Sequence, residues 1–296
     1  MSHSTMKHSL SDRIFDFANT LFMIMMIVIT LYPFYYVVAA SLSNSDLLMS
    51  HRGLLLAPQG FNLDAFKRVL DNPNILSGYR NTLFILIAGT AINLLLTSLG
   101  AYALSRKFML RRWIMVGIVF TMYFSGGLIP NYLLINNWLH MGNSYLALML
   151  PVAVSTWNLI VMRTSFEAIP ESLIESSRID GSGDWGILFR IVLPLSMPVI
   201  AVMILYYGVG YWNSWFNAML FLQDRNLFPL QLILREILVQ NSTDTMQLGS
   251  AMGDQQAIGE SIKYATIVVA TVPILCVYPF LQKYFVKGVM IGAVKE

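Results

Sequence analysis

Six apolar segments alternate with polar intervals along the chain, and each is long enough to cross a bilayer, which takes about 20 residues of helix. They occupy residues 14–40, 82–104, 113–136, 144–164, 195–222 and 262–284. Because hydrocarbon cannot satisfy unpaired backbone groups, such segments fold as helices. The pattern predicts an all-α, polytopic membrane bundle of six transmembrane helices over residues 14–285, with tails at residues 1–13 and 286–296. The first segment continues past the length of a signal-peptide core, so we expect an uncleaved span.

Basic residues predict which ends of the segments face the cytoplasm. They gather before the first segment, between the second and third, around the interval after the fourth, and after the sixth: Lys7, Arg13, Arg106, Lys107, Arg111, Arg112, Arg163, Arg178, Arg190, Lys283, Lys287 and Lys295. With six spans these groups all lie on one side, which the positive-inside rule assigns to the cytoplasm. The loop at residues 41–81 also carries basic residues, but its length weakens the rule there. We therefore expect both termini in the cytoplasm.

The polar interval between the fourth and fifth segments is patterned as two short helices. Pro170 suits a first turn, where its missing N–H costs nothing. Glu171 and Glu175 follow one turn apart, near the positive end of the helix dipole. Arg178 lies three residues after Glu175 on the same face, and Gly181 supplies a residue that ends the helix.

The second of these helices is expected to begin at Asp184, whose carboxylate can cap it. An apolar stripe follows at helical spacing, made of Trp185, Leu188, Phe189 and Val192. Spacing alone is explained equally well by an ordinary amphipathic connector that lies on the membrane surface.

The composition supports a membrane protein and argues against several kinds of active site. Hydrophobic residues make up 56% of the 296 and charged residues 12%, which is more apolar than a soluble domain of this size. Acidic and basic side chains are nearly absent from the predicted spans, which removes the usual signature of an ion-coupled carrier. No G-x-x-x-x-G-K-[ST] motif, G-x-S-x-G motif or metal-ligand spacing occurs, and the net charge of +3 is dispersed. We therefore expect no catalytic residue, metal, cofactor or nucleic acid on this chain.

The fifth segment mixes aromatic rings with amide side chains. Sugars present apolar C–H faces to rings and hydroxyl groups to amides, so this mixture suits a carbohydrate path. The candidate path residues are Tyr211, Trp212, Asn213, Trp215 and Asn217, with Asn131 from the third segment. The alternative is an aromatic belt at the membrane interface, which explains the rings well but the amides less well. Interhelical hydrogen bonds explain most other neutral polar residues of the spans, such as Asn93, Thr97, Ser98 and Asn158.

Fixed spacings in the polar interval carry a family resemblance. Glu175-Ser176-Ser177 is followed after three residues by Gly181, and Ile191-Val192-Leu193-Pro194 begins ten residues after that glycine. This resembles the EAA loop of bacterial ABC importer permeases, whose pattern is Glu-Ala-Ala, three residues, Gly, nine residues and Ile-x-Leu-Pro. Here two serines replace the alanines, a change of one small residue for another. The resemblance implies a cytosolic coupling loop at residues 165–194 within the ABC importer type I permease fold.

Other stretches resemble the carbohydrate branch of these permeases. The Trp212-Asn213 segment is similar to one in maltose-type sugar permeases. Residues 126–130, 158–166, 229–231 and 287–295 look like the LplC-like branch, which is associated with oligosaccharides released from complex polysaccharides. The substrates that this resemblance implies include uronic-acid-containing chains such as alginate or rhamnogalacturonan fragments, and no residue selects among them.

The resemblance also implies a transport complex in the bacterial cell membrane. Its other members would be a second homologous permease subunit, two cytosolic ATPase subunits that bind ATP and Mg, an extracytoplasmic solute-binding protein, the oligosaccharide and membrane lipid. The residues implied in coupling to the ATPases are Glu171, Ile174, Glu175, Arg178, Ile179, Asp180 and Gly181, with Glu175 offering charge and the two isoleucines apolar contact. The alternative function is a secondary carrier or membrane scaffold without ATPase partners, which has no need of the EAA spacing.

Overall fold

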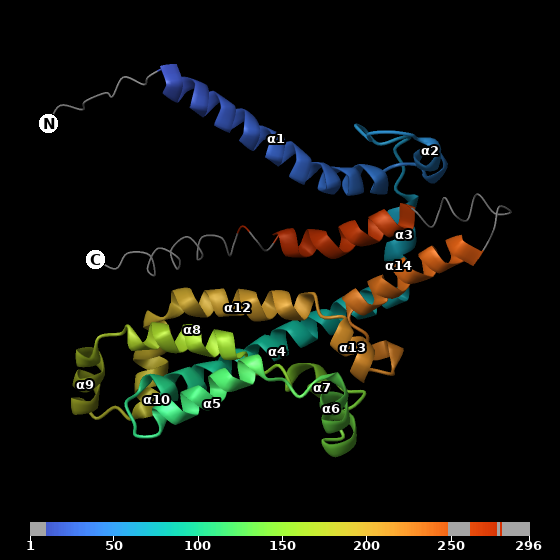
Figure 1. Cartoon of the computed structure of the whole chain (residues 1–296). Coiled ribbons are helices and arrows are strands. Elements are labelled where there is room, and N and C mark those ends of the chain that lie inside the picture. The colour runs from blue at the N-terminus through green and yellow to red at the C-terminus, as the bar shows by residue number, and fades with distance from the viewer. Residues whose placement is uncertain (1–9, 248–260, 277–278, 280–296) are drawn as a thin grey trace. The chain divides into compact units, whose positions relative to one another are not determined.

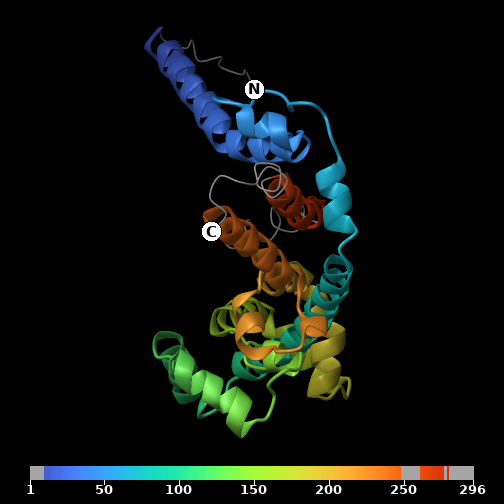
Figure 2. The same cartoon turned by 90° about the vertical axis from the view of Figure 1, so that its right-hand side faces the viewer.

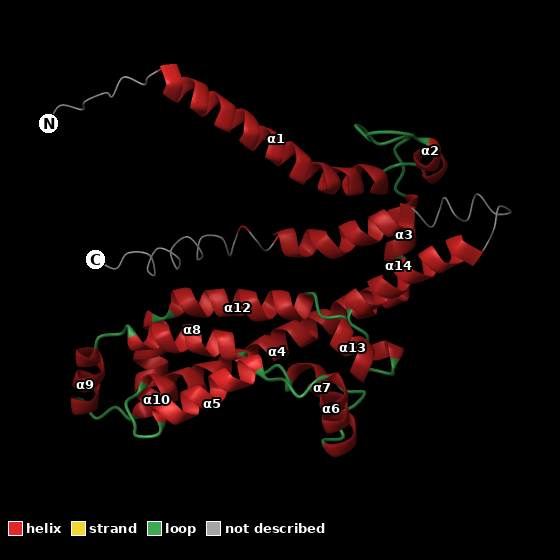
Figure 3. Cartoon of the chain, viewed as in Figure 1, coloured by secondary structure: helices red, strands yellow, loops and turns green. Residues whose placement is uncertain are grey.

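The computed structural model describes residues 10–247, 261–276 and 279, and within them the regular elements are helices (Figure 3). The first half contains α1 (Leu10–Ser41), α2 (Ser45–Ser50), α3 (Asp64–Leu70), α4 (Pro73–Ser105), α5 (Arg111–Tyr123), α6 (Leu128–Leu133), the π-helical turn η1 (Leu134–Trp138) and α7 (Leu146–Met149). The second half contains α8 (Thr156–Glu167), α9 (Glu171–Ile179), α10 (Asp184–Ile187), the π-helical turn η2 (Leu188–Val192), α11 (Leu193–Leu195), α12 (Met197–Trp212), α13 (Phe216–Phe221), the 3-10 turn η3 (Arg225–Leu227), α14 (Leu230–Gln247) and a helix at Ser261–Cys276. The predicted all-α fold class is confirmed.

The chain divides into two compact units. The first comprises residues 1–71 and 238–269, and the second residues 72–237 and 270–296. In the first unit the apolar helix α1 exposes most of its side chains, as a lipid-facing span would. Its C-terminal end packs Ala39 and Ala40 against Leu48 and Leu55 in a small core.

The second unit is built around α4, which packs against α8 and α12; the three helices lie together in both views (Figures 1 and 2). Pro73 occupies the first turn of α4, where it is best tolerated. The buried polar groups of α4 find partners on other elements: the amide of Asn81 donates to the carbonyl oxygens of Asn226 (2.7 Å) and Phe228 (3.0 Å). The hydroxyl of Thr82 accepts the N–H of Leu230 at 2.8 Å. These bonds fix the start of α14 against α4.

Two helices among the described residues have the length and composition of a continuous membrane span, and they correspond to the first two predicted segments. They are Ser11–Ser41 and Pro73–Ser105. Two bent helix pairs also qualify if each is one span: Arg111–Tyr123 with Leu128–Trp138, at 110°, and Asp184–Leu195 with Met197–Trp212, at 83°. The described residues therefore supply two to four spans by this criterion, and the count of six remains a prediction.

The predicted third, fourth and fifth spans are wrong as single straight helices. The third bends at Gly127, whose φ of +88° is a conformation that glycine adopts without strain. The fourth is interrupted at residues 150–155 around Pro151, which has no N–H to continue a helix. The fifth breaks after Trp212 and resumes as α13. The predicted sixth span begins in the helix Ser261–Cys276, and most of its remainder, like the tail at residues 286–296, lies outside the described residues.

Candidate functional site

The helix α9 is the exposed arm of the second unit (Figure 1). It begins at Glu171, so Pro170 occupies the N-cap position, where it makes no capping hydrogen bond, rather than the first turn. It ends as predicted at Gly181, whose φ of +84° lies in the left-handed region. The N–H of Gly181 bonds the carbonyl oxygen of Arg178, and the N–H of Ser182 bonds that of Ser177, both at 3.0 Å. This Schellman arrangement satisfies the last carbonyls and turns the chain toward α10.

One face of α9 is buried in its own chain. Ile174 is only 3% exposed and packs in a core with Phe166 and Ile187. It therefore offers no apolar surface to a partner, and the expectation that it would is corrected. The other six predicted coupling residues, Glu171, Glu175, Arg178, Ile179, Asp180 and Gly181, are exposed, and Ile179 is 86% exposed.

Asp184 joins α9 to α4 instead of capping α10. The residue before α10 is Gly183, and no side chain caps the helix, so the predicted cap at Asp184 is wrong. Its Oδ1 accepts hydrogen bonds from Arg178 Nη2 and from the hydroxyl of Tyr102, both at 3.3 Å. Glu175, by contrast, has no ion pair within the described part of the chain. Its carboxylate is consequently available at the surface.

The apolar stripe of the second short helix faces two ways. Leu188 and Val192 are buried in the same core as Ile174. Trp185 and Phe189 are exposed, with their rings stacked at 6.2 Å. The stripe therefore anchors α10 and η2 to the chain and also leaves an aromatic pair at the surface.

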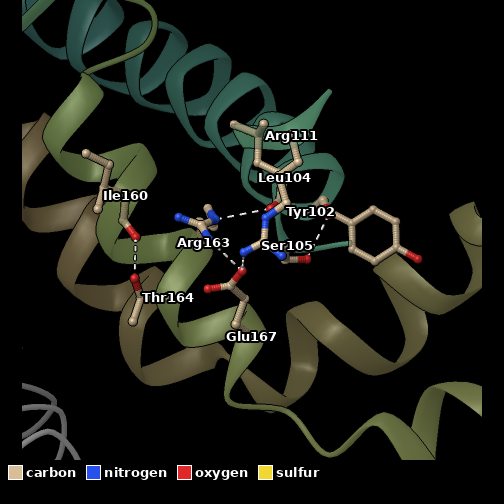
Figure 4. A network of polar contacts seen from close by, with 8 residues as sticks. All are labelled: Tyr102, Leu104, Ser105, Arg111, Ile160, Arg163, Thr164 and Glu167. Carbon is tan, nitrogen blue, oxygen red and sulfur yellow. Dashed lines mark hydrogen bonds and ion pairs between the residues drawn. The ribbon is translucent and has the colours of Figure 1, made fainter. Parts of the chain in front are cut away.

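A charged network links the C-terminal end of α8, which precedes α9, to α4 and α5 (Figure 4). Glu167 at the end of α8 accepts hydrogen bonds from Arg163 Nη2 (2.7 Å) and from Arg111 Nη2. Arg163 Nε also donates to the carbonyl oxygen of Leu104 at 3.1 Å. The three charged side chains are each less than one third exposed, so this network is better shielded than a surface ion pair. Sequence reasoning missed it: Arg163 and Glu167 form an i,i+4 pair within α8, but Arg111 and Leu104 join them from α5 and α4.

A cavity of about 290 Å³ lies among α4, α7, α8, α12 and α13. Its lining consists of Asn93, Leu148, Val152, Ser155, Asn158, Tyr206, Tyr207, Gly210, Tyr211, Ser214 and Asn217. Apart from the tyrosines, no side chain of the lining is ionisable. The cavity therefore offers neutral hydrogen-bond donors and acceptors beside aromatic rings.

Hydrogen bonds hold two tyrosines of this cavity in place. The hydroxyl of Tyr211 donates to Asn93 Oδ1 at 3.0 Å. The hydroxyl of Tyr207 lies 2.7 Å from Thr97 Oγ1 and accepts the N–H of Ser155 at 3.2 Å. The predicted role of Asn93 and Thr97 in interhelical hydrogen bonding is thus confirmed, and Asn93 lines the cavity as well.

The six predicted path residues are not all brought together. Tyr211 and Asn217 line the cavity. The other four lie elsewhere. Trp212 is buried beside the ring of Tyr79, and the ring of Trp215 lies 4.4 Å from the guanidinium carbon of Arg235. Asn213 at the end of α12 and Asn131 on α6 are exposed. Sequence reasoning missed Asn158 and Ser155 as cavity residues, because a lone neutral side chain in an apolar segment has no distinctive pattern.

The described residues contain no group of three or more His, Cys, Asp or Glu side chains that could hold a metal ion.

Comparisons with known proteins match the chain over most of its length. The family described as binding-protein-dependent transport system inner membrane component matches residues 94–291. The polygalacturonan/rhamnogalacturonan transport system permease protein YtcP of Bacillus subtilis is 41% identical over 290 residues, which are 97% of this chain and 100% of that protein. Protein LplC of the same organism is 40% identical over 292 residues, 98% of each chain. A crystal structure of a bacterial ABC transporter involved in the import of the acidic polysaccharide alginate superposes with a TM-score of 0.86 at 31% identity, covering 95% of this chain and 100% of that one.

Proposed function

The chain belongs to the family of binding-protein-dependent transport system inner membrane components, and from this premise we propose that it forms half of the path of an ATP-driven oligosaccharide importer. The observation that carries the proposal is the full-length likeness to YtcP, whose name states transport of polygalacturonan and rhamnogalacturonan. Family membership makes the chain a multi-pass membrane permease, which favours the importer over a secondary carrier or scaffold.

The proposed substrates are oligosaccharides derived from acidic polysaccharides. The cavity beside α12 supports a sugar path, because amides and hydroxyls can bond sugar hydroxyl and carboxylate groups while tyrosine rings cover apolar C–H faces. Asn217 and Tyr211 are the predicted path residues that line it, and Asn93 and Asn158 join them. The second permease subunit would complete the path from the other side.

The outward face of α9 is proposed as the contact with the ATPase subunits. A short helix seated in a groove is a recurring mode of recognition. Glu175 would supply charge and Ile179 apolar contact, and the exposed rings of Trp185 and Phe189 extend the apolar surface. ATP and Mg would bind to those partners, whose closure would move α9, with Asp184 and the Glu167 network passing the motion to α4, α5 and α8.

The remaining partners and the orientation follow from the same proposal. A solute-binding protein would deliver the oligosaccharide outside the cell membrane, and the termini with α9 would lie in the cytoplasm, where the basic residues gather. Bound solute outside and ATP inside would then favour the same conformational state.

Affinity purification of the tagged chain in mild detergent tests this proposal. We expect an ATPase with a Walker A motif and a second permease subunit to copurify. Glu175→Lys should release the ATPase, because it reverses the exposed charge of α9. The matched control Asp64→Lys, another exposed carboxylate outside α9, should retain it. A wild-type chain that purifies alone in a folded form would overturn the importer, and equal retention in both variants would overturn the role of Glu175.

A further inference from the structure

A groove of about 640 Å³ lies at the turn between α4 and α5. Four of its lining side chains are basic, namely Lys107, Arg111, Arg112 and Arg163. The others are apolar, namely Phe108, Met109, Met115, Val116 and Val119. We refer to it as the basic groove, and its combination of cations with an apolar wall is unlike the neutral cavity beside α12.

The basic groove lies at the turn that joins two apolar helices, where a chain that spans the membrane would reach the lipid headgroups. The span Pro73–Ser105 ends just before it, and α5 begins at Arg111. Along α5 no residue is fully buried: Met115 and Ile118 pack against the core, whereas Val116 and Phe120 are each 56% exposed. Trp113, next to the groove, is 73% exposed, and tryptophan is enriched at the membrane interface. The cations would thus be placed at headgroup depth and the apolar wall beside acyl chains.

The basic groove keeps a net positive charge after its ion pairs with Glu167 and Glu171 are subtracted. Arg111 and Arg163 share the carboxylate of Glu167. Lys107 Nζ lies 3.2 Å from Glu171, but both side chains are more than 60% exposed, so solvent weakens this pair. Arg112 is exposed and has no ion pair within the described residues. Four cations facing two carboxylates leave a net charge of +2.

We propose that the basic groove binds an anionic phospholipid, with its phosphate at Arg112 and Lys107 and an acyl chain along Met115, Val116 and Val119. A phosphodiester carries one negative charge, which complements the excess of cations. A soluble anion would use the cations but would gain nothing from the apolar wall, whereas a lipid uses both. This site goes beyond the transport function, because it concerns the surroundings of the permease and not its cargo.

Native mass spectrometry of the full chain, purified from membranes with its copurifying subunits, tests the proposal. Phosphatidylglycerol and phosphatidylcholine with identical acyl chains are titrated separately. We expect phosphatidylglycerol to bind at least fivefold more tightly. Arg112→Gln should weaken phosphatidylglycerol about fivefold, as expected for one basic residue near an anionic headgroup, and leave phosphatidylcholine unchanged. Lys107→Gln added to it should weaken binding further.

Two controls keep the proposal open to refutation. Arg52→Gln removes another exposed arginine, outside the groove, and should leave binding unchanged. Circular dichroism should show the same helix content in all variants. Equal affinity for the two lipids, or an Arg112→Gln variant that binds like Arg52→Gln, would overturn the site. Glycerophosphoglycerol, the headgroup without acyl chains, should compete poorly. Displacement of the lipid by glycerophosphoglycerol or by inorganic phosphate at similar concentration would overturn the lipid in favour of a soluble anion.

Discussion

Among single residues, Gly181 sets the direction in which the chain leaves α9. Its φ of +84° is unfavourable for a residue with a β-carbon, although a β-carbon there would meet no atom within 4 Å. The cost of substitution is therefore backbone strain and not a clash, about 1–2 kcal/mol for most residues. That strain would act on the junction between the exposed helix and α10.

Gly181→Val should abolish substrate-stimulated ATPase activity in the reconstituted importer while membrane insertion stays intact, because valine resists the left-handed conformation and would redirect α9. Gly181→Asn is the matched control and should keep most of the activity, since asparagine tolerates this conformation. Equal activity of the two variants would show that the backbone angle is not what matters.

Residue-level prediction succeeded where the signal was local. Gly181 follows Pro170, Glu175 and Arg178, whose spacing indicates a helix, so its role could be inferred from its neighbours. Asp184 could not be interpreted in this way, because one of its partners, Tyr102, is 82 residues away in the sequence. The inward direction of Ile174 depends in the same way on which helices surround α9.

At the scale of elements, the hydrogen bonds and ion pairs of the Glu167 network hold α4, α5 and α8 together. Glu167→Gln should lower stability by about 1–3 kcal/mol, because two partly buried guanidinium groups lose their carboxylate. Thermal unfolding in detergent measures this. Glu171→Gln removes the carboxylate of an exposed pair and should change stability by less than about 1 kcal/mol. Similar shifts in both variants would mean that the network is no stronger than a surface pair.

The close contact between α4 and α12 depends on a missing side chain. A β-carbon at Gly89 would lie 2.5 Å from the ring of Tyr211, so Gly89→Ala must displace that ring and its bond to Asn93. We expect a loss of about 1–3 kcal/mol from overpacking. At Gly208 of α12 a β-carbon would meet nothing within 4 Å, and Gly208→Ala should be neutral or stabilising by up to about 1 kcal/mol. Unfolding curves in which the two variants coincide would contradict this packing.

Element-level prediction was good for long helices and poor at their breaks. The first two spans were found because their apolar runs are continuous. The breaks at Gly127 and Pro151 carry sequence signals, but a hydropathy average over about 20 residues passes over one glycine or proline.

At the scale of the whole molecule, the neutral cavity is expected to affect the uptake of oligosaccharide. Asn217→Leu should reduce uptake of labelled oligosaccharide about fivefold, because one hydrogen-bonding amide of the cavity is replaced by an apolar group. Basal ATPase activity should not change. Asn131→Leu makes the same exchange at an exposed position of α6 and should leave uptake unchanged. If Asn131→Leu reduced uptake and Asn217→Leu did not, the sugar path would lie along α6.

Membrane character could be predicted from composition, and the family from fixed spacings, but the cavity could not. Its lining is drawn from five helices and the loops between them, spread over residues 93–217, and the sequence marks only the aromatic segment of α12 and α13. Which of the aromatic and amide side chains there face inward is set by packing against α4 and α8.

The inward position of Ile174 bears on how α9 could be exchanged between related importers. Along α9 the residues that hold the helix to its own chain, Ile174 and Ser177, are separate from those that face outward. If α9 contacts the ATPase as proposed, substitutions at the outward positions should change which ATPase it binds without disturbing the fold. A hybrid permease that keeps Ile174 and Ser177 and takes its exposed α9 residues from a different system should bind that system's ATPase. Transfer of the whole loop would also replace the buried residues of α9 by side chains that pack against a different core.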